Sequence, residues 1–137
     1  VNVPSSHRTT GVSNTDVVVY VTTESSSSAS YVAWAIACFI DDHNRPVAGQ
    51  INFNLYNMGS SYSDDLIVAL HELTHLLGFS SSFYSLYRDP ATQKVYAQPT
   101  ITATERGKSV MKLATPKLLA TARYHYGCPS LNGLELE

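Results

Sequence analysis

The residues with the clearest chemical potential lie in the stretch VALHELTHLLGF, from Val68 to Phe79. His71 and His75 are four positions apart, so on a helix both imidazoles project from one face, one turn apart. Two neutral imidazoles at this spacing can bind one zinc ion at roughly 2.0–2.1 Å each. Glu72 is rotated by about 100° from His71 and can take a proton from a metal-activated water. The pattern predicts a hydrolytic zinc centre, with Zn2+ as cofactor, His71 and His75 as metal ligands and Glu72 as the catalytic base.

The segment that contains this motif is the clearest predicted helix of the chain, at about residues 63–78. Ser63 is the expected N-cap, and Asp64 and Asp65 suit the positive end of the helix dipole. Gly78 suits the position just past the end, and apolar residues recur at helical spacing. This apolar stripe consists of Leu66, Ala69, Leu70, Leu73, Leu76 and Leu77. A surface helix with two solvated histidines is the alternative, but the place of the motif on an amphipathic helix favours the metal site.

The histidine pair is not a complete catalytic zinc site, because such sites normally have three protein ligands and a water. Ser81 stands where a compact site would have its third histidine. Of the other histidines, His7 lies in a polar terminal stretch and His43 in a turn-forming loop, and both are expected to be solvated. His125 lies in a second expected helix and is a weaker candidate for the third ligand than a residue from outside the chain. We therefore expect the third ligand beyond Glu137.

Three strands are predicted before the motif helix. Asp16–Thr23 is rich in β-branched and aromatic residues, which favour strands. The apolar run Tyr31–Ile40 is short enough for a buried strand, with Trp34 in the core. It is also shorter than the roughly 20 residues that span a bilayer, so we expect no transmembrane segment. Gln50–Tyr56 alternates apolar and polar residues, which is typical of a half-buried strand.

After the motif helix, the sequence predicts an irregular segment from Ser80 to Thr115 and a second helix at about residues 115–126. Thr115 is the expected N-cap, Pro116 the first helical residue and Gly127 the residue after the end. The order of strands, helix, loop and helix indicates an α+β fold. We expect one domain over all 137 residues, with a small mixed β-sheet packed on the motif helix.

Composition and charge exclude several classes of function. The chain is 44% hydrophobic and 15% charged, as in ordinary globular proteins. A net charge of −2 gives no reason to expect a nucleic acid as partner. The two cysteines, Cys38 and Cys128, lie outside any CxxC pair, so a thiolate metal site is not predicted. They could be cross-linked to each other, free, or paired with cysteines outside the chain.

Together with its flanks, the motif resembles the leishmanolysin family of zinc endopeptidases, a branch of the metzincins. The resemblance covers nearly the whole chain. The similar segments are TTGVSNTDVVVYVT, AWAIACFIDDHNRPVAGQINFN, HELTHLLGFSSSF and ATARYHYGCPSLNGLELE. In that family the third histidine follows a long insertion, so the resemblance implies that this chain stops just short of its third ligand. It also implies that Ser81 is the expected residue.

Several properties of this chain are implied by the resemblance. His71 and His75 match the family's zinc ligands, while Glu72 matches its general base and Gly78 its turn glycine. The fold is expected to be the N-terminal subdomain of a metzincin-like catalytic domain. The two cysteines fall on family positions that bond within a secreted fold, which implies an extracellular or cell-surface location.

The resemblance further implies a polypeptide substrate, held in extended form along a cleft. Pairing with an exposed strand edge is a common way to hold such a chain, and Ala48–Asn54 is the candidate edge. An ordinary internal strand is the alternative for the same residues. The implied partner is the remainder of the catalytic domain or a larger assembly. The alternative functions are a non-catalytic binding or structural subunit, or a structural metal site closed by a fourth protein ligand.

Overall fold

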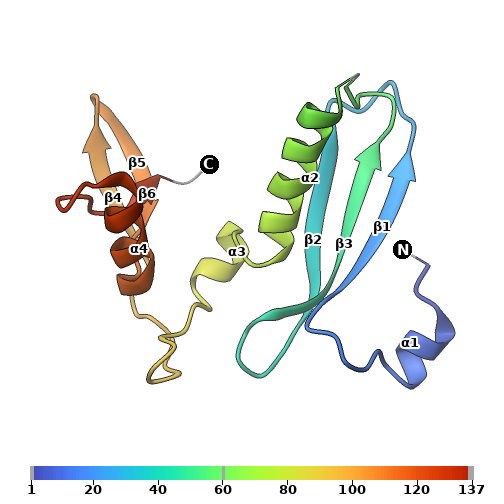
Figure 1. Cartoon of the computed structure of the whole chain (residues 1–137), viewed down its shortest axis with the longest axis horizontal. Helices are drawn as coiled ribbons and strands as arrows, with labels where there is room; N and C mark the ends of the chain where they lie inside the picture. The colour runs from blue at the N-terminus through green and yellow to red at the C-terminus, as the bar shows by residue number, and fades with distance from the viewer. Residues whose placement is uncertain (1, 60, 136–137) are drawn as a thin grey trace. The chain divides into compact units, whose positions relative to one another are not determined.

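The computed structural model describes residues 2–59 and 61–135. It contains two compact units, Val1–Ser80 and Ser81–Glu137. Each unit combines a small sheet with helices, so the expected α+β class is confirmed at that level (Figure 1). The expectation of a single domain remains a prediction.

A three-stranded mixed sheet and one long helix form the first unit. Its elements are α1 (Ser5–Thr9), β1 (Val18–Glu24), β2 (Ala33–Ile40), β3 (Pro46–Asn54) and α2 (Tyr62–Leu76). The strand order is β1-β3-β2, with β1 parallel and β2 antiparallel to β3. The helix α2 packs on β2 and β3, as Figure 1 shows. The small mixed sheet packed on the motif helix is therefore present.

The strand β3 is the centre of this sheet, and the prediction that Ala48–Asn54 forms an exposed edge is wrong. Ala48 pairs with Val18 of β1, and Gln50 pairs with Ile36 of β2, so both sides of the strand are occupied. The reason is topological: the chain returns between the two earlier strands, which local sequence does not reveal. The strand β2 lies at the edge of the described sheet next to α2.

Close packing joins the end of α2 to the beginning of β3. Leu76 is completely buried, and a Cβ atom added at Gly49 would lie 2.7 Å from the Leu76 Cγ atom. Real Cβ atoms do not come this close, so the helix can approach the sheet here only because residue 49 is glycine. Gly78 has a φ angle of 110° and turns the chain just after the helix.

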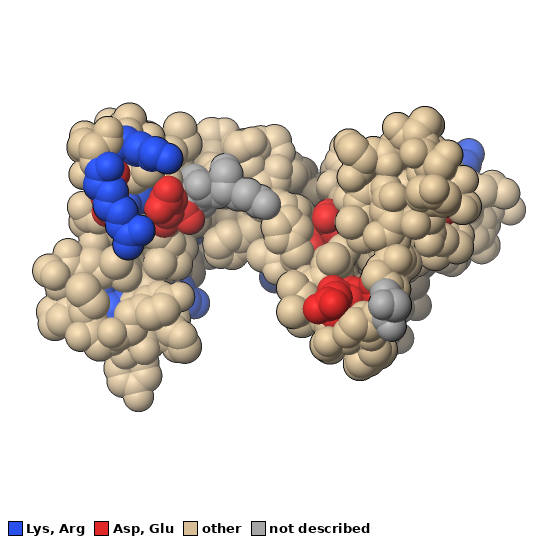
Figure 2. Space-filling model, turned by 90° about the horizontal axis from the view of Figure 1, so that it is seen from above, with Lys and Arg blue, Asp and Glu red and all other residues tan. Residues whose placement is uncertain are grey.

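The strand β2 is less buried than its apolar sequence predicted. Ile36 is 54% exposed and Phe39 is 70% exposed, and Trp34 at 36% is not a core residue, which corrects both expectations. The physical reason is that α2 covers one face of the sheet, where Ala33 lies, while Trp34 points to the opposite face. Figure 2 shows a face of the molecule on which uncharged side chains predominate.

The helix α2 begins slightly earlier and ends slightly earlier than predicted. Its N-cap residue is Ser61 rather than Ser63, and the Oγ atoms of these two serines lie 2.7 Å apart. The segment Tyr62–Tyr84 is long and apolar enough to cross a membrane by length and composition, with a mean hydropathy of 1.2. The packing of α2 on the sheet and the turn at Gly78 favour a helix of a globular unit. The absence of a transmembrane segment therefore remains a prediction.

The second unit contains a sheet that sequence reasoning missed. Its elements are α3 (Ser81–Tyr84), β4 (Thr100–Glu105), β5 (Lys108–Leu113), α4 (Pro116–Tyr126) and β6 (Leu134–Glu135). The strands form an antiparallel sheet in the order β4-β5-β6. The expectation of an irregular segment from Ser80 to Thr115 is therefore wrong.

A two-residue turn makes the β4–β5 hairpin possible. Arg106 and Gly107 both have positive φ angles, 50° and 78°, which is the signature of a type I′ turn. The helix α4 follows the prediction, because Thr115 is its N-cap and Pro116 its first residue. Gly127 ends it in the left-handed conformation, with a φ angle of 60°.

Candidate metal centre

The two histidines of the motif converge in space. His71 and His75 project from successive turns of α2, and their Nε2 atoms lie 2.9 Å apart. Their ring centroids are 4.5 Å apart and the ring planes are nearly perpendicular, at 88°. Two nitrogen ligands of a tetrahedral zinc ion are separated by roughly 3.3 Å. A widening of a few tenths of an ångström, within reach of small side-chain rotations, would therefore suit the pair to one zinc ion.

The other ring nitrogen of His75 is held by the backbone. Its Nδ1 atom lies 2.7 Å from the carbonyl oxygen of Phe79, which can only accept a hydrogen bond. The contact therefore selects the tautomer in which Nδ1 carries the proton and Nε2 presents a lone pair. The positive φ angle of Gly78 reverses the chain so that Phe79 lies back over the last turn of α2, where its N–H donates to the Thr74 carbonyl at 3.2 Å.

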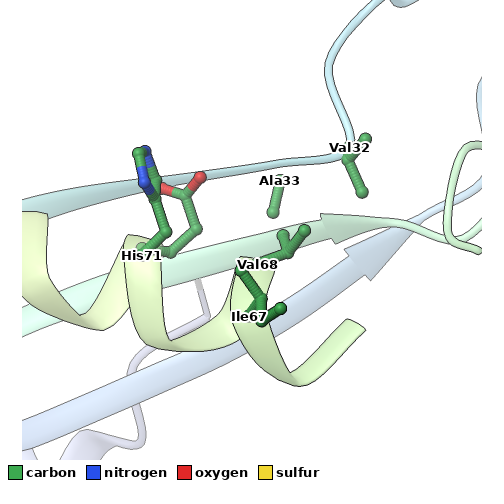
Figure 3. A pocket seen from close by; sticks show the side chains of 6 residues that line it. Val32, Ala33, Ile67, Val68 and His71 are labelled. Carbon is green, nitrogen blue, oxygen red and sulfur yellow. The ribbon is translucent and has the colours of Figure 1, made fainter. Parts of the chain in front are cut away.

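A pocket of about 290 Å³ lies beside this pair and is shown in Figure 3. Its lining comes from the start of β2 and from two turns of α2: Val32, Ala33, Ile67, Val68, His71 and Glu72. Glu72 is only 8% exposed, so its carboxyl group belongs to the wall of the pocket and not to the outer surface. The volume corresponds to roughly ten water molecules, since one water occupies about 30 Å³ in the liquid.

The other histidines do not join the pair. In the described residues 2–59 and 61–135, no group of three or more His, Cys, Asp or Glu side chains could hold a metal ion. His7 is half-buried and shares a hydrogen bond of 3.1 Å with the Tyr20 hydroxyl, which corrects the expectation of a solvated side chain. His43 is exposed in the β2–β3 loop, and His125 is exposed on α4. A third ligand from outside the chain remains a prediction.

Both cysteines are free thiols in the structure. Cys38 is exposed and lies where the pairing of β2 with β3 is irregular, between Ala37 and Phe39. Cys128 is partly exposed. Pairing with cysteines outside the chain remains a prediction.

Sequence reasoning missed three contributors to this region. The Phe79 carbonyl was missed because backbone groups leave no mark in a motif. Val32 and Ala33 were missed because their approach to α2 is set by the pairing of distant strands. The close contact at Gly49 was signalled only by a glycine inside a strand, which often marks close approach of another segment.

The comparisons with known proteins agree with the sequence pattern. The leishmanolysin family model, peptidase family M8, matches residues 1–137. Leishmanolysin from Leishmania amazonensis is 40% identical over 139 residues, and the leishmanolysin homolog of Crithidia fasciculata is 34% identical over 136 residues. Each match covers 98% of this chain.

A third relative carries the name metallopeptidase. The ciliated left-right organizer metallopeptidase of Mus musculus is 33% identical over 141 residues, which cover 93% of this chain. The chain spans about a fifth of the length of these curated relatives, between 20% and 21%. Because the family model matches the chain from end to end, the chain belongs to the leishmanolysin family of metallopeptidases.

Proposed function

We propose that this chain contributes part of the catalytic centre of a zinc-dependent endopeptidase. In this proposal, His71 and His75 bind the metal through their Nε2 atoms, and a third ligand comes from outside the 137 residues. The observation that carries the proposal is the convergence of the two Nε2 atoms to 2.9 Å. It is supported by the Phe79 carbonyl, which leaves the Nε2 atom of His75 available as a ligand.

In this proposal, Glu72 acts as the general base. A zinc ion bound there would polarise the scissile carbonyl and lower the pKa of a water in the site. The Glu72 carboxylate takes the proton of the attacking water and then delivers it to the nitrogen of the leaving amine. Glu72 lines the same pocket as His71, which brings its carboxyl group next to the proposed metal position.

The substrate in this proposal is a polypeptide held beside β2, rather than beside the predicted residues Ala48–Asn54. The strand β2 begins at Ala33, which lines the same pocket as His71 and Glu72. It lies at the edge of the described sheet, where an extended chain can pair with it as an added strand. A peptide bound there runs past the two side chains that are proposed to act on it.

The finer expectations about fold and location are also proposals. We propose a metzincin-like catalytic domain of which this chain forms an N-terminal part, located at the cell surface or outside the cell. Membership of the leishmanolysin family supports both statements. Disulfide bonds from Cys38 and Cys128 to cysteines outside the chain would agree with that location.

A non-catalytic subunit is the second candidate function. It is favoured by one observation, the absence of a third metal-binding side chain near the pair in the described residues. In that case the fold would serve to bind a partner within a larger assembly. Metal content and activity separate the two candidates, since a non-catalytic relative would cleave no protein even when zinc is supplied.

Replacement of Glu72 is the direct test of the catalytic proposal. In the native protein that carries this sequence, we expect casein cleavage that is abolished by a chelator and restored by zinc. Glu72→Gln should lower the rate by roughly a factor of 10³ while zinc remains bound, since general bases contribute about 10²–10⁴. Asp64→Asn, an exposed carboxylate in the first turn of the same helix, is the matched control and should leave the rate unchanged. Undiminished cleavage by Glu72→Gln would exclude the mechanism.

A further inference from the structure

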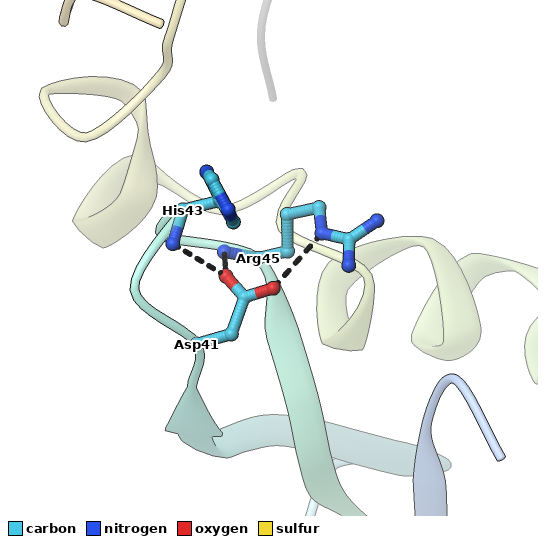
Figure 4. A network of polar contacts seen from close by, with 3 residues as sticks. All are labelled: Asp41, His43 and Arg45. Carbon is cyan, nitrogen blue, oxygen red and sulfur yellow. Dashed lines mark hydrogen bonds and ion pairs between the residues drawn. The ribbon is translucent and has the colours of Figure 1, made fainter. Parts of the chain in front are cut away.

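The loop between β2 and β3 is organised by one carboxylate. The Oδ1 atom of Asp41 accepts hydrogen bonds from the backbone N–H groups of His43 and Arg45, at 2.9 Å and 2.8 Å. Its Oδ2 atom accepts a bond from Arg45 Nε at 3.0 Å, as Figure 4 shows. Backbone bonds close the turn from both sides: Asp41 N–H donates to the Arg45 carbonyl at 2.9 Å, and Asn44 N–H donates to the Asp41 carbonyl at 2.9 Å. Five bonds therefore meet at one residue.

This turn fixes the position of Pro46, the first residue of β3. Pro46 follows Arg45 directly and pairs with Ile40, the last residue of β2. The pairing between these strands is irregular just before this point, so the ladder alone does not hold Pro46 firmly. The Asp41 turn supplies the missing constraint, because it ties both ends of the loop together.

Pro46 also lies near Gly78, the residue that turns the chain just after α2. A Cβ atom added at Gly78 would be 3.7 Å from both the Cγ and the Cδ atoms of Pro46. Glycine accepts many backbone conformations, so its φ angle of 110° must be fixed by the atoms around it. The Pro46 ring lies beside this turn, and the Gly78 N–H donates a hydrogen bond to the His75 carbonyl at 3.0 Å. The next residue, Phe79, supplies the carbonyl that holds His75.

We propose that Asp41 is a positioning residue for the metal centre, acting through Pro46 and the Gly78 turn to hold the Phe79 carbonyl against His75. The proposal rests on the proposed function for its consequence, zinc binding, but not for its geometry. Without Asp41, the turn loosens and Pro46 no longer supports Gly78. The Phe79 carbonyl then leaves His75, whose imidazole takes up a mixture of tautomers. Zinc binding weakens because part of the population carries the proton on Nε2.

The test measures the tautomer of His75 directly, by nitrogen-15 NMR of the metal-free protein at a pH of about 8, where free imidazole is neutral. In the wild type, we expect His75 Nδ1 to be protonated and Nε2 to be unprotonated. Asp41→Ala should shift both nitrogens towards the averaged values of a free histidine. Zinc affinity, measured by competition with a chelating dye, should fall by roughly tenfold, the lower end of the range for groups that orient a ligand.

Asp42→Ala is the matched control, because it removes an exposed neighbouring carboxylate of the same charge. It should leave both the nitrogen shifts and the affinity unchanged. Asp41→Asn keeps one acceptor oxygen and should restore part of each. Should Asp41→Ala fail to fold, Asp41→Asn and Pro46→Ala carry the test by the same two readouts.

Unchanged His75 shifts in folded Asp41→Ala would overturn the proposal. The tautomer is read without metal and without substrate, so the outcome is independent of peptidase activity. If the protein cleaved no substrate and Asp41→Ala still altered the tautomer, the proposed function would fail and the positioning role would stand. The opposite result, cleavage with an unresponsive tautomer, would reject only the positioning role.

Discussion

The helices α2 and α4 both carry histidine near their C-terminal ends, but they differ in what surrounds it. In α2, His71 and His75 share one face and bring their Nε2 atoms to 2.9 Å, beside the fully buried Leu76. In α4, His125 is exposed and its ring contacts that of its neighbour Tyr126, with a centroid separation of 4.8 Å. Histidine alone therefore does not make a site. The spacing of four residues and the packing that orients this face of the helix are both required.

Removal of one histidine from each helix gives the largest expected contrast. His75→Ala should weaken zinc binding by at least about 100-fold, because a ligand and its oriented hydrogen bond are lost together. His125→Ala should leave zinc binding unchanged. Isothermal titration with zinc under identical conditions measures both. Equal losses for the two variants would show that His125 is the missing ligand, and would break the comparison.

Glycine replacements compare the packing of the two helices. Gly49→Ala places a Cβ atom 2.7 Å from Leu76 Cγ, beneath α2, and overpacking of this kind costs about 1–3 kcal/mol. Gly127→Ala at the end of α4 meets no atom within 4 Å, so its cost is the left-handed φ angle alone, about 1 kcal/mol. Urea unfolding measures each change in the free energy of unfolding. A larger loss at Gly127 would show that α2 tolerates displacement from the sheet.

The smallest expected effects concern the loss of folding stability in acid. Two similar turns, at Asp41 and Asp89, can be compared in this respect. The backbone N–H of Arg45 lowers the pKa of Asp41, and the backbone N–H of Thr92 lowers the pKa of Asp89. Both carboxylates bind a proton less readily in the folded than in the unfolded chain. Their stabilisation is therefore complete above the ordinary aspartate pKa, near 3.9, and is lost as the pH falls through the lower folded value.

Substitution by asparagine should flatten the acid limb of the stability profile at either position. Asp41→Asn should have the larger effect, because Asp41 also accepts a bond from the Arg45 side chain, whereas Asp89 binds the backbone N–H groups of Ala91 and Thr92. Melting temperatures between pH about 5 and 2 provide the measurement, with each variant compared to wild type. Parallel profiles for wild type and Asp41→Asn would show that the turn adds no stability.

The same two helices show what the sequence could predict. Both were located to within two residues, because apolar periodicity and terminal signals such as Thr115 and Gly127 are local properties. The pairing of His71 and His75 followed from helical geometry in the same way. At the start of α2, the structure uses Ser61 as the N-cap instead of the predicted Ser63.

The failures concern contacts between distant residues or overlooked local signals. The central position of β3 depends on the strand order, which no local pattern encodes. Trp34 is exposed because α2 covers only one face of the sheet and Trp34 points to the other. This packing is also not encoded in a local pattern. The β4–β5 hairpin is different: the stretch TITATERGKSVMKL contains alternating residues around Arg106 and Gly107, and this turn signal was available but not used.

The edge position of β2 also affects how the isolated chain will behave in solution. An accessible strand edge that can accept a peptide can equally accept the same strand from a second molecule, and the apolar side chains of Ile36 and Phe39 add to that attraction. Concentrated samples should therefore self-associate, and short extended peptides should dissolve the aggregates by competing for the edge. Purification at low concentration, with such a peptide present, is the practical remedy.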